Sequence, residues 1–225
     1  LIVNTDHGFL LSEHDWWGKN AMPDFNEIAH TPLFIWDPVS GVCGERRSAL
    51  TQTIDLAPTL LAFFGRPIPP DMRGRSLLPV IRENAAAHDY ALFGYFNGPI
   101  NITDGRYVYM RARADDAVQM HQYTMMPTAM DNRLPVEQLR QAELAPPFPF
   151  TKGCPTFRIP VPAQNGKLPR GGHRLYDLAA DPKQAQPIEE GETEARLLRA
   201  MGRLLAENDA PEAVYAAYGI PHPTE

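Results

Sequence analysis

The sequence predicts an α/β protein with a layered core followed by a small antiparallel sheet and a helix. Residues 1–65 alternate apolar, strand-like runs with loops and a helical segment, the order typical of α/β layering. After about residue 83 the chain becomes aromatic and alternating, as in an antiparallel meander. An amphipathic helix is predicted over residues 192–208. We therefore expect a core over residues 1–83 and a subdomain over residues 84–225.

Two apolar runs are the predicted strands of the core. Leu1–Thr5 is rich in β-branched residues and ends at Asp6-His7-Gly8, a pattern typical of a buried parallel strand that leads into a functional loop. Residues 9–20 are polar and aromatic and suit an ordered loop. The second run, residues 32–38, lies between two prolines and is a candidate central strand.

A helix is predicted over residues 53–65. Its apolar side chains recur at spacings of three and four residues, as on one face of a helix. Pro58 falls where the first helical turn tolerates proline, and Gly65 supplies a stop signal. This helix completes the strand, loop, strand and helix order of the core.

The subdomain is predicted from turn chemistry and alternation. Residues 90–96 are aromatic and extended, and the turn pair Asp104-Gly105 leads into an alternating strand. Residues 112–170 contain much proline and methionine with little periodicity, so we expect an irregular excursion over the surface. Residues 173–178 form one more short strand, and the tail from Ala210 is expected to be a loose cap.

Composition excludes several function classes. The net charge is −6 with mixed signs, and no basic block or nucleic-acid motif is present, so we expect no nucleic-acid partner. The sequence contains no run of 18 or more apolar residues, so no membrane span is predicted. Cys43 and Cys154 are too few for a disulfide framework or a zinc–thiolate site, and one disulfide cannot be deduced. The start at Leu1 without Met indicates a fragment or processed product, and localisation stays undetermined.

Asp6 and His7 are the strongest candidates for chemistry. They follow a predicted strand, at the edge where open α/β sheets place their ligands. A carboxylate oxygen and an imidazole nitrogen can supply part of a divalent-metal site. The alternative is an ordinary strand-end turn in which Asp6 accepts hydrogen bonds from local amides.

The loop after Asp6-His7 contains further candidates. Lys19 on its own could be a surface lysine. His14 could line a pocket or make a structural hydrogen bond within the loop. Trp16 and Trp17 could stack on a sugar or aryl ring, or simply pack the loop.

Four motifs resemble, in order and spacing, those of the type I sulfatases of the alkaline-phosphatase-like superfamily. They are Thr5–Gly8 with Lys19 and Thr31–Pro38, Ile54–Leu61 with Gly65, Gly74–Pro79, and Leu175–Leu178 with Asp181-Pro182. The resemblance covers nearly the whole chain apart from the excursion. It implies the C-terminal part of an alkaline-phosphatase-like core followed by a small antiparallel-sheet-plus-helix subdomain.

The resemblance also implies roles for these residues. Asp6 and His7 match the family's second pair of metal ligands, on calcium in most members, so the site is incomplete in this chain. Lys19 matches the lysine that binds the sulfate group, where an ammonium can neutralise charge on the ester oxygens as the S–O bond breaks. His14, in the same loop, is a candidate substrate-binding residue. The family usually has Gly where Ser12 stands, so we expect a slightly different loop.

The family's nucleophile is absent from the sequence. It is a Cys in a C-x-P-S-R context that is oxidised to formylglycine, and an early Asp-Asp pair supplies the other metal ligands. Neither Cys43 nor Cys154 has that context. The implied function is therefore a sulfuric ester hydrolase in its intact form, acting on a sugar or aryl sulfate. We expect formylglycine only in the missing N-terminal half, and the fragment alone to be inactive.

Two other functions remain open. The same fold serves phosphate and phosphonate ester hydrolases or transferases, and the identity of the missing nucleophile would separate these. A non-catalytic scaffold module would bind no calcium through Asp6 and His7. Specificity is expected from Asn97, Asn101 and the segment His121–Met130, since excursions on a rigid scaffold tend to carry recognition. Exposed sheet edges predict a homo-oligomer or association with the missing half.

Overall fold

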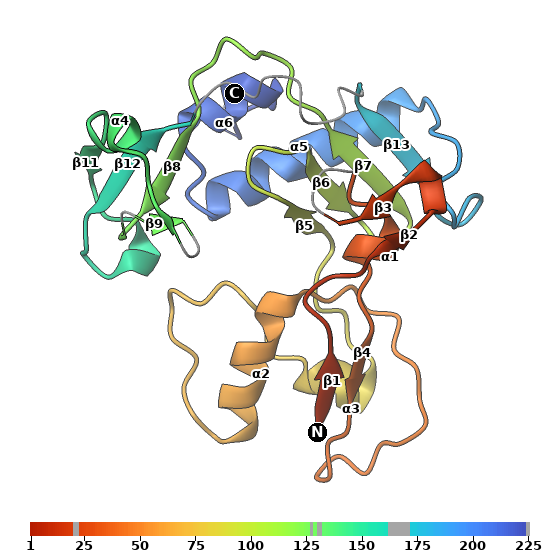
Figure 1. Cartoon of the computed structure of the whole chain (residues 1–225). Helices are drawn as coiled ribbons and strands as arrows, with labels where there is room; N and C mark the ends of the chain where they lie inside the picture. Colours follow the sequence, from red (N-terminus) through yellow and green to blue (C-terminus); the bar gives the residue numbers. More distant parts are fainter. Residues whose placement is uncertain (20–22, 127, 130–131, 162–171, 224–225) are drawn as a thin grey trace.

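The computed structural model describes residues 1–19, 23–126, 128–129, 132–161 and 172–223. Figure 1 shows three groups of elements: a lower part with β1, β4, α2 and α3, an upper sheet with long helices, and a separate group of short strands around β8 and β12. The lower part and the upper sheet are connected near α1 and β5.

The lower part contains the first and second predicted strands and the predicted helix. Its elements are β1 (Ile2–Asn4), β4 (Leu33–Ile35), a 3₁₀ turn (Thr53–Asp55), α2 (Leu56–Phe63) and α3 (Leu78–Glu83). The helix over residues 53–65 is confirmed, with Pro58 in its first turn and Gly65 at φ 62° beyond its end. Leu33 and Ile35 pack with Leu77 and Val80 in one apolar cluster.

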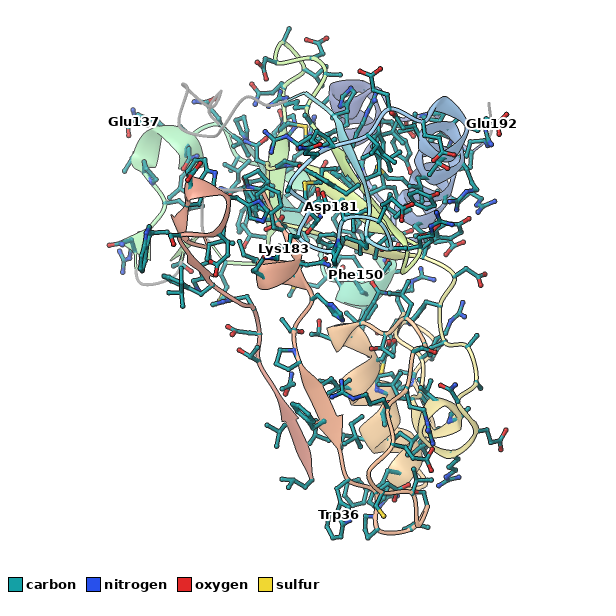
Figure 2. The ribbon with its side chains drawn as sticks, turned by 90° about the vertical axis from the view of Figure 1, so that its right-hand side faces the viewer. Trp36, Glu137, Phe150, Asp181, Lys183 and Glu192 are labelled. Carbon is teal, nitrogen blue, oxygen red and sulfur yellow. The ribbon has the colours of Figure 1, made fainter. Side chains whose placement is uncertain are left out.

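The prediction of a buried parallel first strand is wrong within this chain. β1 pairs antiparallel with β4, and the described residues supply no other strand to this sheet. One face packs on the helices, but the other carries exposed apolar side chains: Leu1, Val3, Phe34 and Trp36. We call these four residues the open face. Figure 2 shows Trp36 at the lower end of the molecule. Strands that are apolar on both faces are typical of sheets with a layer on each side, and here one layer is absent.

The upper part is built on a four-stranded antiparallel sheet. Its strand order is β13 (Arg174–Asp177), β7 (Tyr107–Arg111), β6 (Ile100–Thr103) and β5 (Ala91–Gly94). Asp104-Gly105 joins β6 to β7, and Gly105 has φ 90°, which favours glycine. The predicted meander and the predicted strand over 173–178 are therefore confirmed.

Both faces of this sheet are covered (Figure 1). α5 (Gly191–Glu207) and α6 (Glu212–Tyr218) share a cluster with Tyr109 and Leu175. The hairpin of β2 (Leu10–Leu11) and β3 (Trp17–Gly18), together with α1 (Asn26–Ala29), shares a cluster with Val108 and Tyr176. Neighbouring residues of one strand face opposite layers, as the two-residue period of a strand requires. The helix near residues 192–208 is confirmed.

The predicted loose tail from Ala210 is wrong. α6 buries Tyr215, Ala217 and Tyr218, and the Tyr218 hydroxyl donates to the Gly98 carbonyl at 2.5 Å. A short helix rich in aromatic residues and alanine, such as α6, buries enough apolar area to pack stably on the sheet. No described helix has both the length and the apolar character to cross a membrane.

The irregular excursion predicted over residues 112–170 is partly wrong. It contains β8 (His121–Thr124), β9 (Thr128–Ala129), β10 (Asn132–Arg133), α4 (Val136–Leu139), β11 (Glu143–Ala145), a 3₁₀ turn (Pro149–Thr151) and β12 (Thr156–Pro160). β11, β12 and β8 form an antiparallel sheet with Ile159 fully buried. Strands of two to five residues are too short to show a period in the sequence. Residues 127, 130, 131 and 162–171 lie outside the described residues.

Candidate metal and sulfate site

The structure brings Asp6, His7 and Lys19 together. Asp6 and His7 follow β1, while Lys19 follows β3, at the far end of the β2–β3 hairpin. The Lys19 ammonium contacts Nε2 of His7, twelve residues earlier in the chain. Nε2 of His7 also lies 3.4 Å from Oδ2 of Asp6. The three residues predicted from the sequence therefore form one cluster.

Neighbouring backbone groups orient the His7 ring. Its Nδ1 lies 2.9 Å from the Gly8 carbonyl oxygen, which can only accept, so Nδ1 carries the proton. Nε2 then presents its lone pair to Lys19. Gly8 itself sits so close to α1 that an added Cβ would lie 1.7 Å from the Glu27 carbonyl oxygen. Only glycine fits this approach.

The Asp6 carboxylate is the exposed member of the cluster, with its side chain 82% accessible. Its Oδ1 accepts from the His7 backbone N–H at 3.0 Å and from the Thr5 hydroxyl at 3.3 Å. Desolvation is the largest single contribution and acts to raise its pKa, but the His7 side chain and the hydrogen bonds from backbone N–H groups and the Thr5 hydroxyl together hold the pKa of Asp6 below its ordinary value. The strand-end turn of the alternative interpretation thus exists, and it leaves Oδ2 beside the imidazole.

Asp6 and His7 fit part of a divalent-metal site. Two ligand atoms held about 2.4 Å from one ion at right angles lie about 3.4 Å apart, and Oδ2 of Asp6 and Nε2 of His7 have this separation. Calcium takes 6–8 oxygen ligands, far more than this pair supplies. Within the described parts of the chain, no group of three or more His, Cys, Asp or Glu side chains is arranged to hold a metal ion. The remaining ligands would have to come from elsewhere.

The hairpin that ends at Lys19 has an unusual backbone. Ser12, His14 and Asp15 have φ values of 88°, 55° and 60°, in the left-handed region that non-glycine residues rarely adopt. The usual glycine at the position of Ser12 in sulfatases would adopt this φ without strain. Strain of this kind is retained where the surroundings over-determine it, often at functional loops.

His14 is used inside the hairpin. Its ring stacks on Phe25, with centroids 3.6 Å apart and planes 6° from parallel, and its Nε2 lies 3.4 Å from Oε2 of Glu27. Its side chain is 14% exposed. These contacts favour the structural alternative for His14, and its substrate-binding role stays a prediction. Of the two tryptophans, Trp16 packs on the same cluster as Phe25, whereas Trp17 is exposed.

Two further residues near Lys19 had not been recognised as a pair. Asp24 and Asn101 are 7% and 0% exposed, and Asn101 Nδ2 donates to Oδ2 of Asp24 at 3.1 Å. The prediction that Asn101 contacts substrate is wrong, because a fully buried side chain reaches no ligand. No sequence pattern links positions 77 residues apart, so this pair could not have been found from motifs.

A second buried acid explains two of the four motifs. Asp55, fully buried, accepts from the backbone N–H groups of Gln52 and Arg75 and from His88 Nε2, at 2.7, 2.8 and 2.9 Å. It thereby joins the start of α2 to the Gly74–Pro79 segment. Gly74 is required because an added Cβ would lie 2.0 Å from the Ile54 carbonyl oxygen. The contacts of Asp55 and Gly74 in these two motifs are thus structural.

Cys43 and Cys154 are free and exposed. Neither is part of the Asp6, His7 and Lys19 cluster described above. Their placement agrees with the sequence argument that rejects both as nucleophiles.

Comparison with known proteins supports the interpretation of the motifs. Residues 12–130 match the family model described as N-sulphoglucosamine sulphohydrolase, C-terminal, over more than half of the chain. The chain is 35% identical over 98 residues to an N-acetylglucosamine-6-O-sulfatase of Bacteroides thetaiotaomicron, and 36% identical over 84 residues to human Arylsulfatase K. These alignments cover 43% and 37% of this chain, and 17% and 15% of the relatives.

Solved structures share the fold at lower identity. One, in complex with its substrate D-glucosamine-2-N,6-O-disulfate, matches with a TM-score of 0.61 at 18% identity over 94% of this chain and 35% of that chain. A phosphonate monoester hydrolase from Silicibacter pomeroyi matches with a TM-score of 0.53 at 22% identity over 92% of this chain and 34% of that chain. The chain thus spans about a third of the solved proteins and less than a fifth of the curated relatives.

Proposed function

Because this chain belongs to the N-sulphoglucosamine sulphohydrolase C-terminal family, we propose that it is the C-terminal part of a sulfatase that hydrolyses sulfate esters of amino sugars. The observation that carries the proposal is the contact of Lys19 with His7 beside Asp6. The sugar class is supported by the relative named for N-acetylglucosamine 6-O-sulfate and by the neighbour solved with a sulfated glucosamine. An aryl sulfate is the alternative substrate, supported by the relative named Arylsulfatase K.

In this proposal Lys19 binds the sulfate group. Its ammonium has three N–H donors and a positive charge, and it is held by the hairpin on a covered sheet. Charge develops on the sulfate oxygens and the leaving oxygen as the S–O bond breaks. A pre-positioned cation stabilises that charge at little reorganisation cost. Lys19 is thus the catalytic residue of this chain.

Asp6 and His7 would hold a divalent metal ion, which we assign as calcium. When bound, such an ion polarises the sulfate oxygens. The hydrogen bond from His7 Nδ1 to the Gly8 carbonyl fixes the ring, as is usual for metal-binding histidines. The lone pair of Nε2 meets the Lys19 ammonium in this structure, and it would bind the ion once the ammonium turns to the sulfate group. Asp6, ionised at neutral pH, contributes the hard oxygen.

The nucleophile and the remaining metal ligands would come from a portion of the protein outside this chain. We propose formylglycine for that nucleophile. The same portion would cover the open face, where large apolar side chains have no layer above them within the described structure. Burial of such a surface is the main driving force for association. We also keep a boundary near residue 83 between the core and the subdomain as part of this proposal.

The test is Lys19→Ala in the full-length protein, assayed on N-acetylglucosamine 6-sulfate and on an aryl sulfate. We expect kcat/KM to fall by about 10²-fold or more, because one pre-organised electrostatic contact is worth this much. The control is Lys183→Ala, an exposed lysine labelled in Figure 2. Unchanged turnover in the Lys19 variant would refute its catalytic role.

A phosphonate or phosphate ester hydrolase is the second candidate, favoured by the fold match to the phosphonate monoester hydrolase. The same assay separates the two. Faster hydrolysis of a phenyl phosphonate monoester than of any sulfate ester would select this candidate. No turnover on either class, together with no calcium bound, would select a non-catalytic scaffold.

A further inference from the structure

We propose that Asp24 and Asn101 are positioning residues that hold the segment carrying Lys19 on the C-terminal sheet. The inference rests on the proposed function of Lys19. It concerns how this lysine is placed, and it assigns a role to a buried carboxylate and amide that touch neither substrate nor metal.

The pair joins two parts of the chain that are far apart in sequence, one of them five residues after Lys19. Asp24 is five residues after Lys19 and is almost completely buried, and Asn101 lies on β6 with no exposed surface. The hydrogen bond from Asn101 Nδ2 to Oδ2 of Asp24 is 3.1 Å long and spans 77 residues. It therefore ties the end of the Lys19 segment to the middle of the upper sheet.

Neighbouring contacts reinforce the same connection. The Asn26 backbone N–H donates to Oε1 of the buried Gln184 at 2.7 Å. Phe25 packs edge-on against Tyr176 of β13, with ring centroids 6.2 Å apart. At the start of the hairpin, Leu10 is fully buried in the same cluster. Both ends of the stretch that contains Lys19 are thus fixed on one face of the sheet.

Burying Asp24 and Asn101 costs free energy, which makes a purely structural role for the pair unfavourable. Burial raises the pKa of Asp24 to about 6, although the bond from Asn101 acts to lower it. Within the described part of the chain, Oδ1 of Asn101 has no hydrogen-bond partner. An apolar pair would avoid both penalties. A directional bond gives what apolar packing does not, a fixed distance between the Lys19 segment and the sheet.

The variants Asp24→Ala and Asn101→Ala test the proposal in the full-length protein, because each removes one partner of the hydrogen bond. We expect each to lower kcat by about tenfold or more with little change in KM, because small misplacements of a catalytic group have large effects on rate. Asp89→Ala is the matched control, an exposed carboxylate two residues before β5. Thermal unfolding checks that the variants fold.

Two combinations separate positioning from general destabilisation. In a Lys19→Ala background, Asp24→Ala should lower the residual rate no further, because Asp24 acts through Lys19. The exchange variant Asp24→Asn with Asn101→Asp keeps a carboxylate–amide pair and should recover most of the lost kcat. Three outcomes would each overturn the inference. The first is a wild-type kcat in both single variants, and the second is a loss of rate in the Lys19→Ala background as large as in the wild-type background. The third is no recovery of kcat in the exchange variant.

These outcomes are distinct from failure of the proposed function. If Lys19→Ala itself keeps wild-type turnover, the role of Lys19 and the positioning role fall together. If Lys19→Ala is inactive while Asp24→Ala and Asn101→Ala are unaffected, only the positioning role fails.

Discussion

The upper sheet and the β1–β4 pair differ in how completely this chain covers them. The upper sheet has α5 and α6 on one face and the β2–β3 hairpin with α1 on the other, so its strands are buried on both sides (Figure 1). The β1–β4 pair has helices on one face and the open face on the other. The upper part is therefore stabilised by contacts within the chain. In the lower part, the described residues pack on one face of the β1–β4 pair and leave the apolar side chains of the open face exposed.

The candidate site lies where these two regions meet. Asp6 and His7 follow β1, the strand of the incompletely covered sheet, whereas Lys19 extends from the hairpin on the complete one. A change in the relative position of the two regions would separate the metal ligands from the lysine. The Asp24–Asn101 pair lies on the complete side, which is why it can serve as a fixed reference for Lys19.

The largest expected effect on stability comes from truncating a buried side chain in the core of the upper sheet. Leu197→Ala removes a fully buried side chain between α5 and the sheet and should lower the free energy of unfolding by about 2–5 kcal/mol. Phe34→Ala on the open face removes a side chain that is 67% exposed, and it should change the free energy of unfolding by less than about 0.5 kcal/mol. Urea unfolding of this chain measures both. Equal effects would show that the open face is covered in solution.

The confirmed predictions were those that rest on local signals. The helix over residues 53–65 was found from its apolar spacing and its stop at Gly65. The meander was found from the turn pair Asp104-Gly105 and the alternation of the strand that follows. Such signals act over a few residues and depend little on what lies above the strand or helix. The burial of β1 could not be predicted for this chain, since it depends on a layer outside it.

The cluster of Asp6, His7 and Lys19 was predicted by motif, but its geometry was not. The contact of Lys19 with His7 depends on the β2–β3 hairpin, whose strands have two residues each and leave no period in the sequence. The Asp24–Asn101 bond depends on the packing of the α1 region against the sheet, where Ile28 shares a cluster with Val108 and Met110, a tertiary contact without a local signal. His14 was ambiguous because a histidine in a functional loop suits both packing and binding.

An intermediate effect is expected at the junction, and it depends on pH. The pKa of Asp24 is about 6 in the folded chain against an ordinary 3.8, so the folded state binds more protons than the unfolded state between these values. Stability is therefore lost as pH rises from about 4 through 6. The amide that replaces the carboxyl group in the Asp24→Asn variant carries no charge, so the variant should be more stable than wild type by about 3 kcal/mol at pH 7.5 and about equal at pH 3.5.

Urea unfolding of both proteins at the two pH values measures the difference. Tyr95 is the other titratable group near Asp24. Burial, and then the Asp24 charge, raise its pKa to about 12, so it stays neutral throughout this range. Asn101 does not titrate. A stability difference that is the same at both pH values would show that the Asp24 carboxylate is not buried as described. The variant would then test neither the free-energy cost of burying the Asp24 carboxylate nor the positioning role of Asp24.

The smallest effect on unfolding, and the sharpest contrast between the regions, is expected for Trp36→Ser with Phe34→Ser. Both side chains lie on the open face and are 59% and 67% exposed, so their loss should change the free energy of unfolding by less than about 1 kcal/mol. Exposed apolar patches drive association, however.

We expect the wild-type chain alone to self-associate at micromolar concentration and the double variant to shift towards monomer in sedimentation velocity. The double variant Phe96→Ser with Met126→Ser removes comparably exposed apolar side chains outside the open face and is the control. Equal shifts in both variants would show that association is unspecific, and a monomeric wild-type chain would show that the open face needs no cover.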